Sequence, residues 1–227
     1  MKNGNFQQTI ARIDKLLAKA KASSATIKIL CEKGDMEEAN AEAFHLEEIT
    51  EKVVLLTRAL PAYTGYPRAK SEVNHIIAHT VPVDIGYTEE GWFSVRIPAL
   101  LPKKEHGSAD YIRQILYPAM QRFFKGKIPY KFDKATIVYR HVFDEERPDR
   151  QARDHDNIEV NMTTDIVAMF ALVDDSPKHC SHYYRTDVGC EDRTEIYVVP
   201  SEELPMLLDA FKMMPREGVK LYEERSK

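Results

Sequence analysis

The chain has 227 residues and a formal net charge of −4, and it is 43% hydrophobic and 30% charged. This composition is typical of a folded globular protein and excludes intrinsic disorder. No apolar run has the length of a signal-peptide core or a membrane span, so we expect no membrane association. The three cysteines are widely spaced, which predicts reduced thiols in a cytoplasmic protein rather than a disulfide framework.

The first part of the chain carries two amphipathic repeats. Residues 6–31 place their seam side chains alternately four and three positions apart, as in a heptad-like helix. Gly34 suits the end of that helix, and a second apolar run continues until Pro61. The pattern predicts an antiparallel helical hairpin over residues 1–60, which must pack on the rest of the chain or on another copy. The predicted seam of the first helix consists of Phe6, Ile10, Ile13, Leu17, Ala20, Ser24, Ile27 and Cys31.

Residues 61–80 begin with a stretch rich in Pro, Gly and Tyr and are expected to be a connector. From residue 81 to 227 the patterns follow the order strand, strand, helix, strand, helix, strand, strand, helix. The first two strands form a predicted hairpin, and so do the strands near residues 179–186 and 193–199. This order predicts an α+β domain with a mixed or antiparallel sheet, and it disfavours a doubly wound parallel sheet.

The stretch "RDHDNIEVNMTTDIVAMFALVDDS" (153–176) has aspartates at both ends of an apolar-periodic segment. We expect a helix from about Asn157 to Ala168, a reversal near Met169 and an extended return. Such a helix covers about 18 Å, and six extended residues cover about 20 Å. These lengths would bring the two acidic ends to the same level. The candidate metal-binding carboxylates are Asp154, Asp156, Asp174 and Asp175.

Gathered aspartates would repel one another without a cation, which is why they point to a metal ion. Mg²⁺ prefers carboxylate oxygens and water, and it can activate a water and stabilise charge on a phosphodiester. The alternative is structural. Asp156 or Asn157 would cap the helix, and the "DDSP" sequence would form a turn.

Positive charge is concentrated in one part of this acidic chain. From Arg96 to Arg153 there are thirteen Lys or Arg residues against seven Asp or Glu. Such a segment fits either a solvated face or a surface that meets phosphates.

These residues resemble the core of the RusA-like Holliday-junction resolvases over about residues 90–200. The shared pattern is a strand, an Arg-Pro-rich loop, Asp-x-Asp-Asn before a helix and an Asp-Asp doublet, here "TIVYRHVF", "ERPDRQAR", "DHDN" and "VDD". The spacing of nineteen from Asp156 to Asp175 suits that family, and "FSVRIPALLPKK" resembles its first strand and basic turn. The whole chain also resembles uncharacterised proteins of bacterial mobile elements.

The resemblance implies a Mg²⁺-dependent endodeoxyribonuclease that cuts branched or structured DNA as a homodimer. It implies that Asp154, Asp156 and Asp175 are catalytic metal ligands and that Asp174 is their neighbour. By charge and placement, the residues expected to contact DNA phosphates are Lys103, Lys104, Arg147, Arg150 and Arg153.

The chain departs from the family in one respect that bears on catalysis. The family usually has a catalytic Lys one turn into the helix, where this chain has Val160 and Asn161. Without that Lys, a cation near the scissile phosphate is lost. Two alternatives therefore stand beside the nuclease. One is a catalytically inactive DNA- or protein-binding module, and the other makes the helical hairpin a device for dimerisation or partner binding.

A zinc site at the four residues His179, Cys180, His182 and Cys190 is not expected. Neighbouring residues of a strand point to opposite faces, and the usual paired ligand spacing is missing. In the predicted hairpin, Cys180 and Cys190 would face each other without forming a stable disulfide.

Overall fold

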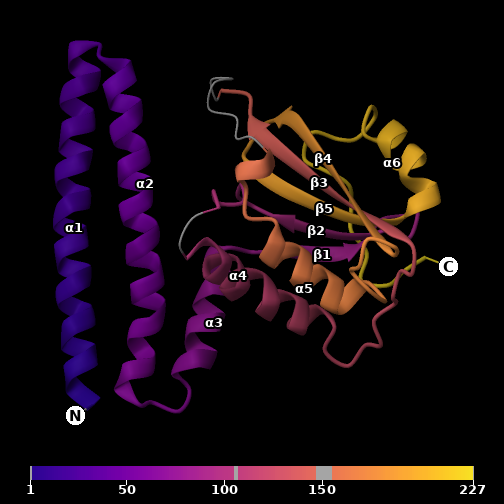
Figure 1. Ribbon diagram of the computed structural model, residues 1–227, viewed down its shortest axis with the longest axis horizontal. Helices are drawn as coiled ribbons and strands as arrows, with labels where there is room; N and C mark the ends of the chain where they lie inside the picture. The colour runs from indigo at the N-terminus through magenta and orange to yellow at the C-terminus, as the bar shows by residue number, and fades with distance from the viewer. Residues whose placement is uncertain (1, 105–106, 147–154, 227) are drawn as a thin grey trace. The chain divides into compact units, whose positions relative to one another are not determined.

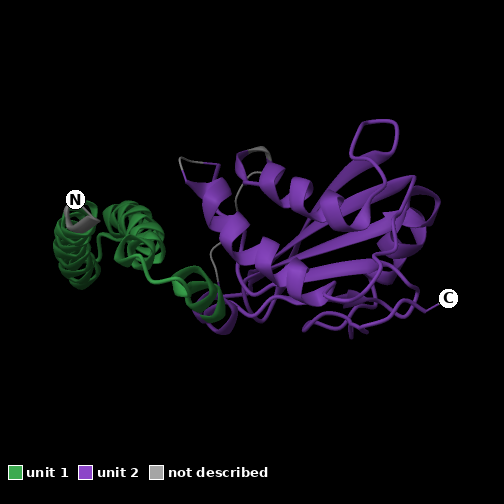
Figure 2. Cartoon of the chain, turned by 90° about the horizontal axis from the view of Figure 1, so that it is seen from below, with its two compact units in different colours: residues 1–75 green, residues 76–227 purple. Residues whose placement is uncertain are grey.

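The computed structural model describes residues 2–104, 107–146 and 155–226, and the chain divides into two compact units, residues 1–75 and 76–227 (Figure 2). The division falls within the range predicted as a connector. There the chain forms a short 3₁₀ helix, Leu60–Thr64, followed by helix α3, Ala69–Thr80. The sequence pattern did not predict α3, because its few apolar residues follow directly on a stretch rich in Pro, Gly and Tyr.

The first unit contains the predicted helical hairpin, formed by α1 (Lys2–Lys33) and α2 (Met36–Ala59) (Figure 1). Gly34 joins the helices with a φ of 79°, a left-handed conformation that glycine adopts without a steric penalty. The Asp35 side chain then caps α2 by accepting a hydrogen bond from the main-chain N–H of Glu38 at 3.4 Å.

The buried seam of α1 differs from the predicted one at alternate positions. Ile13 is buried as expected, but Ser23 is buried in place of Ser24, and Leu17 is 50% exposed. Positions three and four apart share a face of a helix, so the apolar spacing alone does not decide which of two adjacent residues meets the partner helix. Large apolar side chains consequently remain exposed on the hairpin, namely Leu17, Ile29, Met36 and Phe44.

From residue 81 on, the described residues of the second unit form a mixed sheet and three α-helices in the predicted order, which confirms the α+β class (Figure 1). The strand order across the sheet is β1-β2-β5-β3-β4. The strands are β1 (Asp84–Tyr87), β2 (Phe93–Ile97), β3 (Ala135–Asp144), β4 (Cys180–Gly189) and β5 (Arg193–Pro200). The helices are α4 (Ser108–Phe123), α5 (Asn161–Ala171) and α6 (Leu204–Ala210).

The strand pairing matches the first predicted hairpin but not the second. β1 and β2 pair antiparallel, whereas β4 pairs parallel with β3 at the edge of the sheet. β5 is inserted between β2 and β3, antiparallel to both. Its almost wholly buried sequence suits a central strand, and the more exposed β4 suits an edge.

This arrangement also overturns the expectation that Cys180 faces Cys190. Cys180 begins β4 and Cys190 follows its end, so the two lie about 33 Å apart along an extended strand. Cys180, Cys190 and Cys31 are all free thiols.

Helices cover both faces of the sheet, α4 and α5 on one side and α6 on the other (Figure 1). The α4–α5 side holds the larger apolar core, which includes Leu116, Ile137 and Val167. The α6 side holds a smaller core around Tyr197 and Leu207. Among the described helices, none is both long enough and apolar enough to cross a membrane.

A buried ionic network lies within the α6 side. The Glu195 carboxylate accepts hydrogen bonds from Arg140 Nη1 at 2.8 Å, from Arg193 Nε at 2.7 Å and from the Tyr197 hydroxyl at 2.7 Å. Asp187 Oδ2 accepts a further bond from Arg140 Nε at 2.5 Å. Glu195 is fully buried, and each of its oxygens has a charged donor.

Candidate functional site

The acidic segment is not the out-and-back unit that the sequence predicted. Helix α5 continues to Ala171, and the expected reversal near Met169 is wrong. Residues 155–157 form a short 3₁₀ helix before α5, and the aspartate doublet follows the end of α5. The two acidic segments therefore flank opposite ends of a helix about 16 Å long.

Much of the predicted site falls outside the described residues. This applies to Asp154, Arg147, Arg150 and Arg153, and also to the side chain of Asp156. Across the described ranges, no three His, Cys, Asp or Glu side chains are grouped so that they could hold a metal ion.

The aspartate doublet forms a turn, as in the structural alternative. Asp174 accepts hydrogen bonds from the Ser176 main-chain N–H at 3.3 Å and from the Ser176 hydroxyl at 2.6 Å. The hydroxyl of Ser176 is the main reason why the pKa of Asp174 is lowered. Asp175 is exposed, and its charge acts on the first residues of β4, including Cys180 and His182.

The predicted basic turn and the start of the acidic segment lie together. The main-chain N–H of Lys104 donates to the carbonyl of Asn157 at 3.0 Å, and Lys103 forms an antiparallel bridge with Ile158. The N–H of Glu159 donates to the carbonyl of Pro102 at 2.9 Å. Because the main chain makes these bonds, they do not depend on the identity of the two lysine side chains.

Glu159, an additional acid beside the predicted site, has a structural role. Its carboxylate is buried and accepts hydrogen bonds from the Ser108 hydroxyl at 3.1 Å and from the Met162 N–H at 3.3 Å. Glu159 thereby joins the first turns of α4 and α5 and satisfies an N–H group that the helix leaves unpaired.

A histidine–tyrosine cluster, which was not predicted from the sequence, lies on the α5 side of β3 and β4. We define it as Tyr139, His141, His155, His182 and Tyr184. The ring centroids of Tyr139 and Tyr184 are 5.5 Å apart, those of His155 and Tyr184 5.6 Å, and those of His141 and His155 5.7 Å. Rings two residues apart on each strand share a face, so the signal was present in "YRH" and "HYY". The parallel pairing of β3 with β4 was needed to bring them together.

Burial shifts the pKa values of two rings in this cluster. It lowers the pKa of His182, against the opposing charge of Asp175, and it raises the pKa of Tyr184. The Tyr139 hydroxyl shares a hydrogen bond of 2.8 Å with the Thr164 hydroxyl, and His155 Nε2 lies 2.9 Å from Thr186 Oγ1. His182 is thus neutral near neutral pH, and the partly exposed rings of His155 and Tyr184 offer flat surfaces for stacking.

Comparisons with known proteins give a family but no activity. A family model described as "Family of unknown function (DUF6100)" matches residues 2–225. The search of curated proteins gives no match. Among solved structures, the periplasmic domain of Helicobacter pylori MotB (residues 90–256) is similar over 57% of this chain and 86% of that chain, with 10% identity and a TM-score of 0.32. A similarity at this level carries no argument about fold or function.

Proposed function

We propose that this chain, which belongs to the DUF6100 family of unknown function, binds branched or otherwise structured DNA through its second unit. The DNA-binding surface comprises the basic turn Pro102–Lys104, residues 155–158 and the outer rings of the histidine–tyrosine cluster. The observation that carries the proposal is the pairing of Lys104 with Asn157 and of Lys103 with Ile158. It holds the basic turn, which is expected to contact phosphates, beside the start of the predicted acidic segment.

Each part of this surface has a separate task. Lys103 and Lys104 supply phosphate contacts that are independent of DNA sequence. Their main chain is fixed by hydrogen bonds, so only the side chains lose freedom on binding. His155 and Tyr184 supply rings on which an unpaired base can stack, which suits a junction or flap better than an uninterrupted duplex.

The second candidate function is Mg²⁺-dependent cleavage of the same DNA. It is favoured by the element order and by the Asp156-to-Asp175 spacing, with Asp154, Asp156 and Asp175 as ligands and Asp174 beside them. We rank it second because the doublet follows the far end of α5. The start of α5 also carries Val160 as the N-cap and Asn161 as the first residue, where the family that the chain resembles usually has a Lys.

Self-association is proposed for the first unit. The hairpin exposes Leu17, Ile29 and Phe44, and two copies could cover these side chains together. If so, Leu17→Asp should shift the mass measured by light scattering from dimer to monomer, while Lys15→Asp, a change of a polar residue on the same helix, should not. A monomeric wild-type chain at high concentration would refute this part.

The free thiols fit a cytoplasmic setting for DNA binding and for self-association.

Fluorescence anisotropy with a labelled four-way junction tests DNA binding. The wild type should bind the junction more tightly than a linear duplex of the same sequence. The double variant Lys103→Glu with Lys104→Glu should weaken binding at least tenfold. The slope of the logarithm of the binding constant against the logarithm of the salt concentration should become shallower by about two, roughly one for each phosphate that is no longer neutralised. A matched control, Lys15→Glu with Lys19→Glu on α1, applies the same change of charge to the first unit.

Two outcomes decide between the candidates. Junction binding with no product in Mg²⁺ supports the binding module. Junction cleavage in Mg²⁺ that Asp156→Asn abolishes, while circular dichroism and junction affinity stay unchanged, supports the nuclease. Equal loss of binding in the basic-turn variant and in the α1 control would refute the proposed surface.

A further inference from the structure

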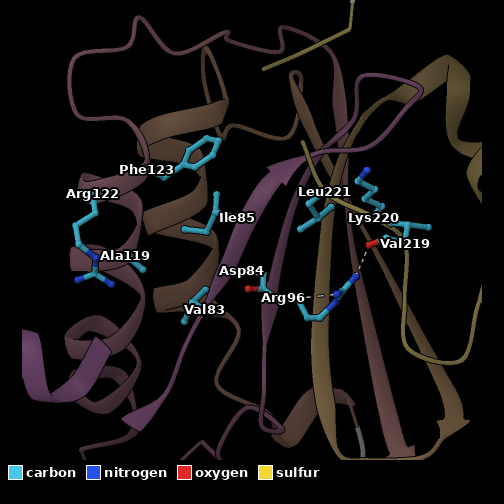
Figure 3. A pocket seen from close by; sticks show the side chains of 10 residues that line it. All are labelled: Val83, Asp84, Ile85, Arg96, Ala119, Arg122, Phe123, Val219, Lys220 and Leu221. Carbon is cyan, nitrogen blue, oxygen red and sulfur yellow. Dashed lines mark hydrogen bonds and ion pairs between the residues drawn. The ribbon is translucent and has the colours of Figure 1, made fainter. Parts of the chain in front are cut away.

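A second candidate site lies at the opposite edge of the sheet from the histidine–tyrosine cluster. It is an open pocket of about 560 Å³ that straddles the outer edge of β1 (Figure 3). On one face of β1 it is lined by Ile85 with Arg122 and Phe123 of α4, and on the other by Arg96 and the C-terminal residues 219–221. Since β1 and β4 are the two edge strands, this pocket is separate from the cluster on β3 and β4.

The main chain of β1 is open toward this pocket. Tyr87 N–H donates to the Tyr222 carbonyl, and the Tyr87 carbonyl accepts from the Tyr222 N–H, both at 2.8 Å, on the side away from β2. In an antiparallel pair the peptide groups alternate in direction, so Ile85, two residues earlier, points the same way as Tyr87. Within the described chain, no group bonds to the outward N–H or carbonyl of Ile85. The outward N–H and carbonyl of Ile85 are therefore open to pairing with one more strand, whereas those of Tyr87 are occupied by Tyr222.

The walls of the pocket carry a surplus of positive charge. Arg122 and Lys220 are exposed, and neither forms an ion pair with any residue in the described ranges. Arg96 donates to the Val219 carbonyl at 2.6 Å and lies 3.8 Å from Asp84, the one carboxylate lining the pocket. Arg122 and Lys220 thus remain available to an acidic ligand from opposite sides of the edge.

We propose that the outer edge of β1 binds an extended acidic peptide segment of a partner protein. The peptide adds as a strand beside Ile85, and its main chain pairs with the open N–H and carbonyl groups. Its Asp or Glu side chains meet Arg122 on one face and Lys220 on the other, because successive side chains of a strand point to opposite faces. Apolar side chains between them contact Phe123 or Leu221.

The test uses the full-length protein and a fluorescein-labelled peptide, Glu-Glu-Val-Ile-Glu-Glu, which as an extended strand presents acidic side chains on both faces. Saturable binding is expected by fluorescence anisotropy. A Lys-Lys-Val-Ile-Lys-Lys peptide should not bind, and N-methylation of alternate peptide nitrogens should weaken binding at least tenfold in one of the two registers. Free glutamate and inorganic phosphate should compete only at far higher concentrations than unlabelled peptide.

Protein variants separate the charge from the main chain. Arg122→Glu should weaken binding of the acidic peptide at least tenfold. Lys125 is an exposed residue just beyond α4, and Lys125→Glu should have little effect on binding. Ile85→Pro removes the outward N–H at an edge position that tolerates proline, and Ile85→Val is its control. Circular dichroism and Trp92 fluorescence establish that each variant is folded.

Three results would overturn the proposal. They are the absence of saturable peptide binding, binding that N-methylation leaves unchanged in both registers, and competition by free glutamate or phosphate at the same concentration as the peptide. The last would identify a site for small anions. Junction DNA binding by Arg122→Glu equal to that of Lys125→Glu would show that the two surfaces act independently.

Discussion

On the α6 side of the sheet, charged groups are buried and paired, whereas at the β4 edge of the α5 side they are exposed beside stacked rings. Glu195 holds Arg140 and Arg193 in a closed network, while Asp175 faces solvent near His182. A buried charge whose partners are all protein groups contributes to the stability of the fold and cannot bind a ligand. The exposed charges at the β4 edge can bind one.

The difference indicates where substitutions should affect folding and where they should affect binding. Both regions contain carboxylates and cations, so composition does not distinguish them. Burial and the number of protein partners do. The buried network should therefore determine the stability of the second unit, and the edge residues should determine what the chain binds.

The largest effect is expected when the buried network loses its central charge. Glu195→Gln leaves Arg140 and Arg193 buried without their shared carboxylate, which should lower the free energy of unfolding by about 3–5 kcal/mol. Urea unfolding followed by the fluorescence of Trp92, the single tryptophan, measures this change. Exposed Glu202→Gln is the control, expected to change stability by about 0.5 kcal/mol or less. Equal urea midpoints for the two variants would mean that the network does not stabilise the fold.

The same network predicts how stability depends on pH. Burial alone would raise the pKa of Glu195 above its usual 4.5, but Arg140 and the surrounding hydrogen bonds bring the pKa below it. A carboxylate with a depressed pKa contributes stability above pH 4.5, and this contribution is lost as the pH falls through the folded-state pKa. The stability advantage of the wild type over Glu195→Gln should thus shrink below pH 4.5. An advantage that stays constant in acid would contradict this assignment.

The sequence was sufficient for features that depend on local pattern. Gly34 marked the hairpin turn, and the order of elements after residue 80 was predicted in full. Each of these rests on helix or strand periodicity and on residues that end helices, which act over a few positions.

Features that depend on strand pairing were not predictable. The strands β4 and β5 are neighbours in sequence, yet β5 lies between β2 and β3, and the histidine–tyrosine cluster exists only because of that choice. The helix after Asn157 likewise begins and ends later than expected, at Asn161 and Ala171. Its start is fixed by Glu159, which accepts hydrogen bonds from Ser108 of α4 and from the N–H of Met162. The contact with Ser108 spans 51 residues and leaves no local signal.

A smaller stability effect is expected from the α5 side. Tyr139→Phe removes the hydrogen bond between the buried Tyr139 hydroxyl and Thr164 while keeping the ring, which should cost about 1 kcal/mol. The control is Tyr183→Phe, because Tyr183 of β4 lies on the α6 side of the sheet and is only partly buried. It should have less effect. Urea unfolding compares the two. A loss as large as that of Glu195→Gln would mean that the cluster, too, is committed to the fold.

The smallest effect concerns a single proton at the β4 edge. Burial depresses the pKa of His182 below its usual 6.5, and Asp175 partly opposes this. Protonation therefore favours the unfolded chain, and the contribution of His182 to stability falls as the pH drops below 6.5. In an NMR titration, Asp175→Asn should lower the His182 pKa further. Asp174→Asn, whose carboxylate is occupied by Ser176, should leave it unchanged.

The same titration separates the two candidate functions. If Asp175 ligates Mg²⁺, adding Mg²⁺ to the wild type should neutralise its charge and lower the His182 pKa as Asp175→Asn does, and the ion should then have no further effect on that variant. If the chain is a binding module without a metal site, Mg²⁺ should leave the His182 pKa of both proteins unchanged. A shift of equal size in both proteins would place the ion elsewhere and remove Asp175 from the proposed ligands.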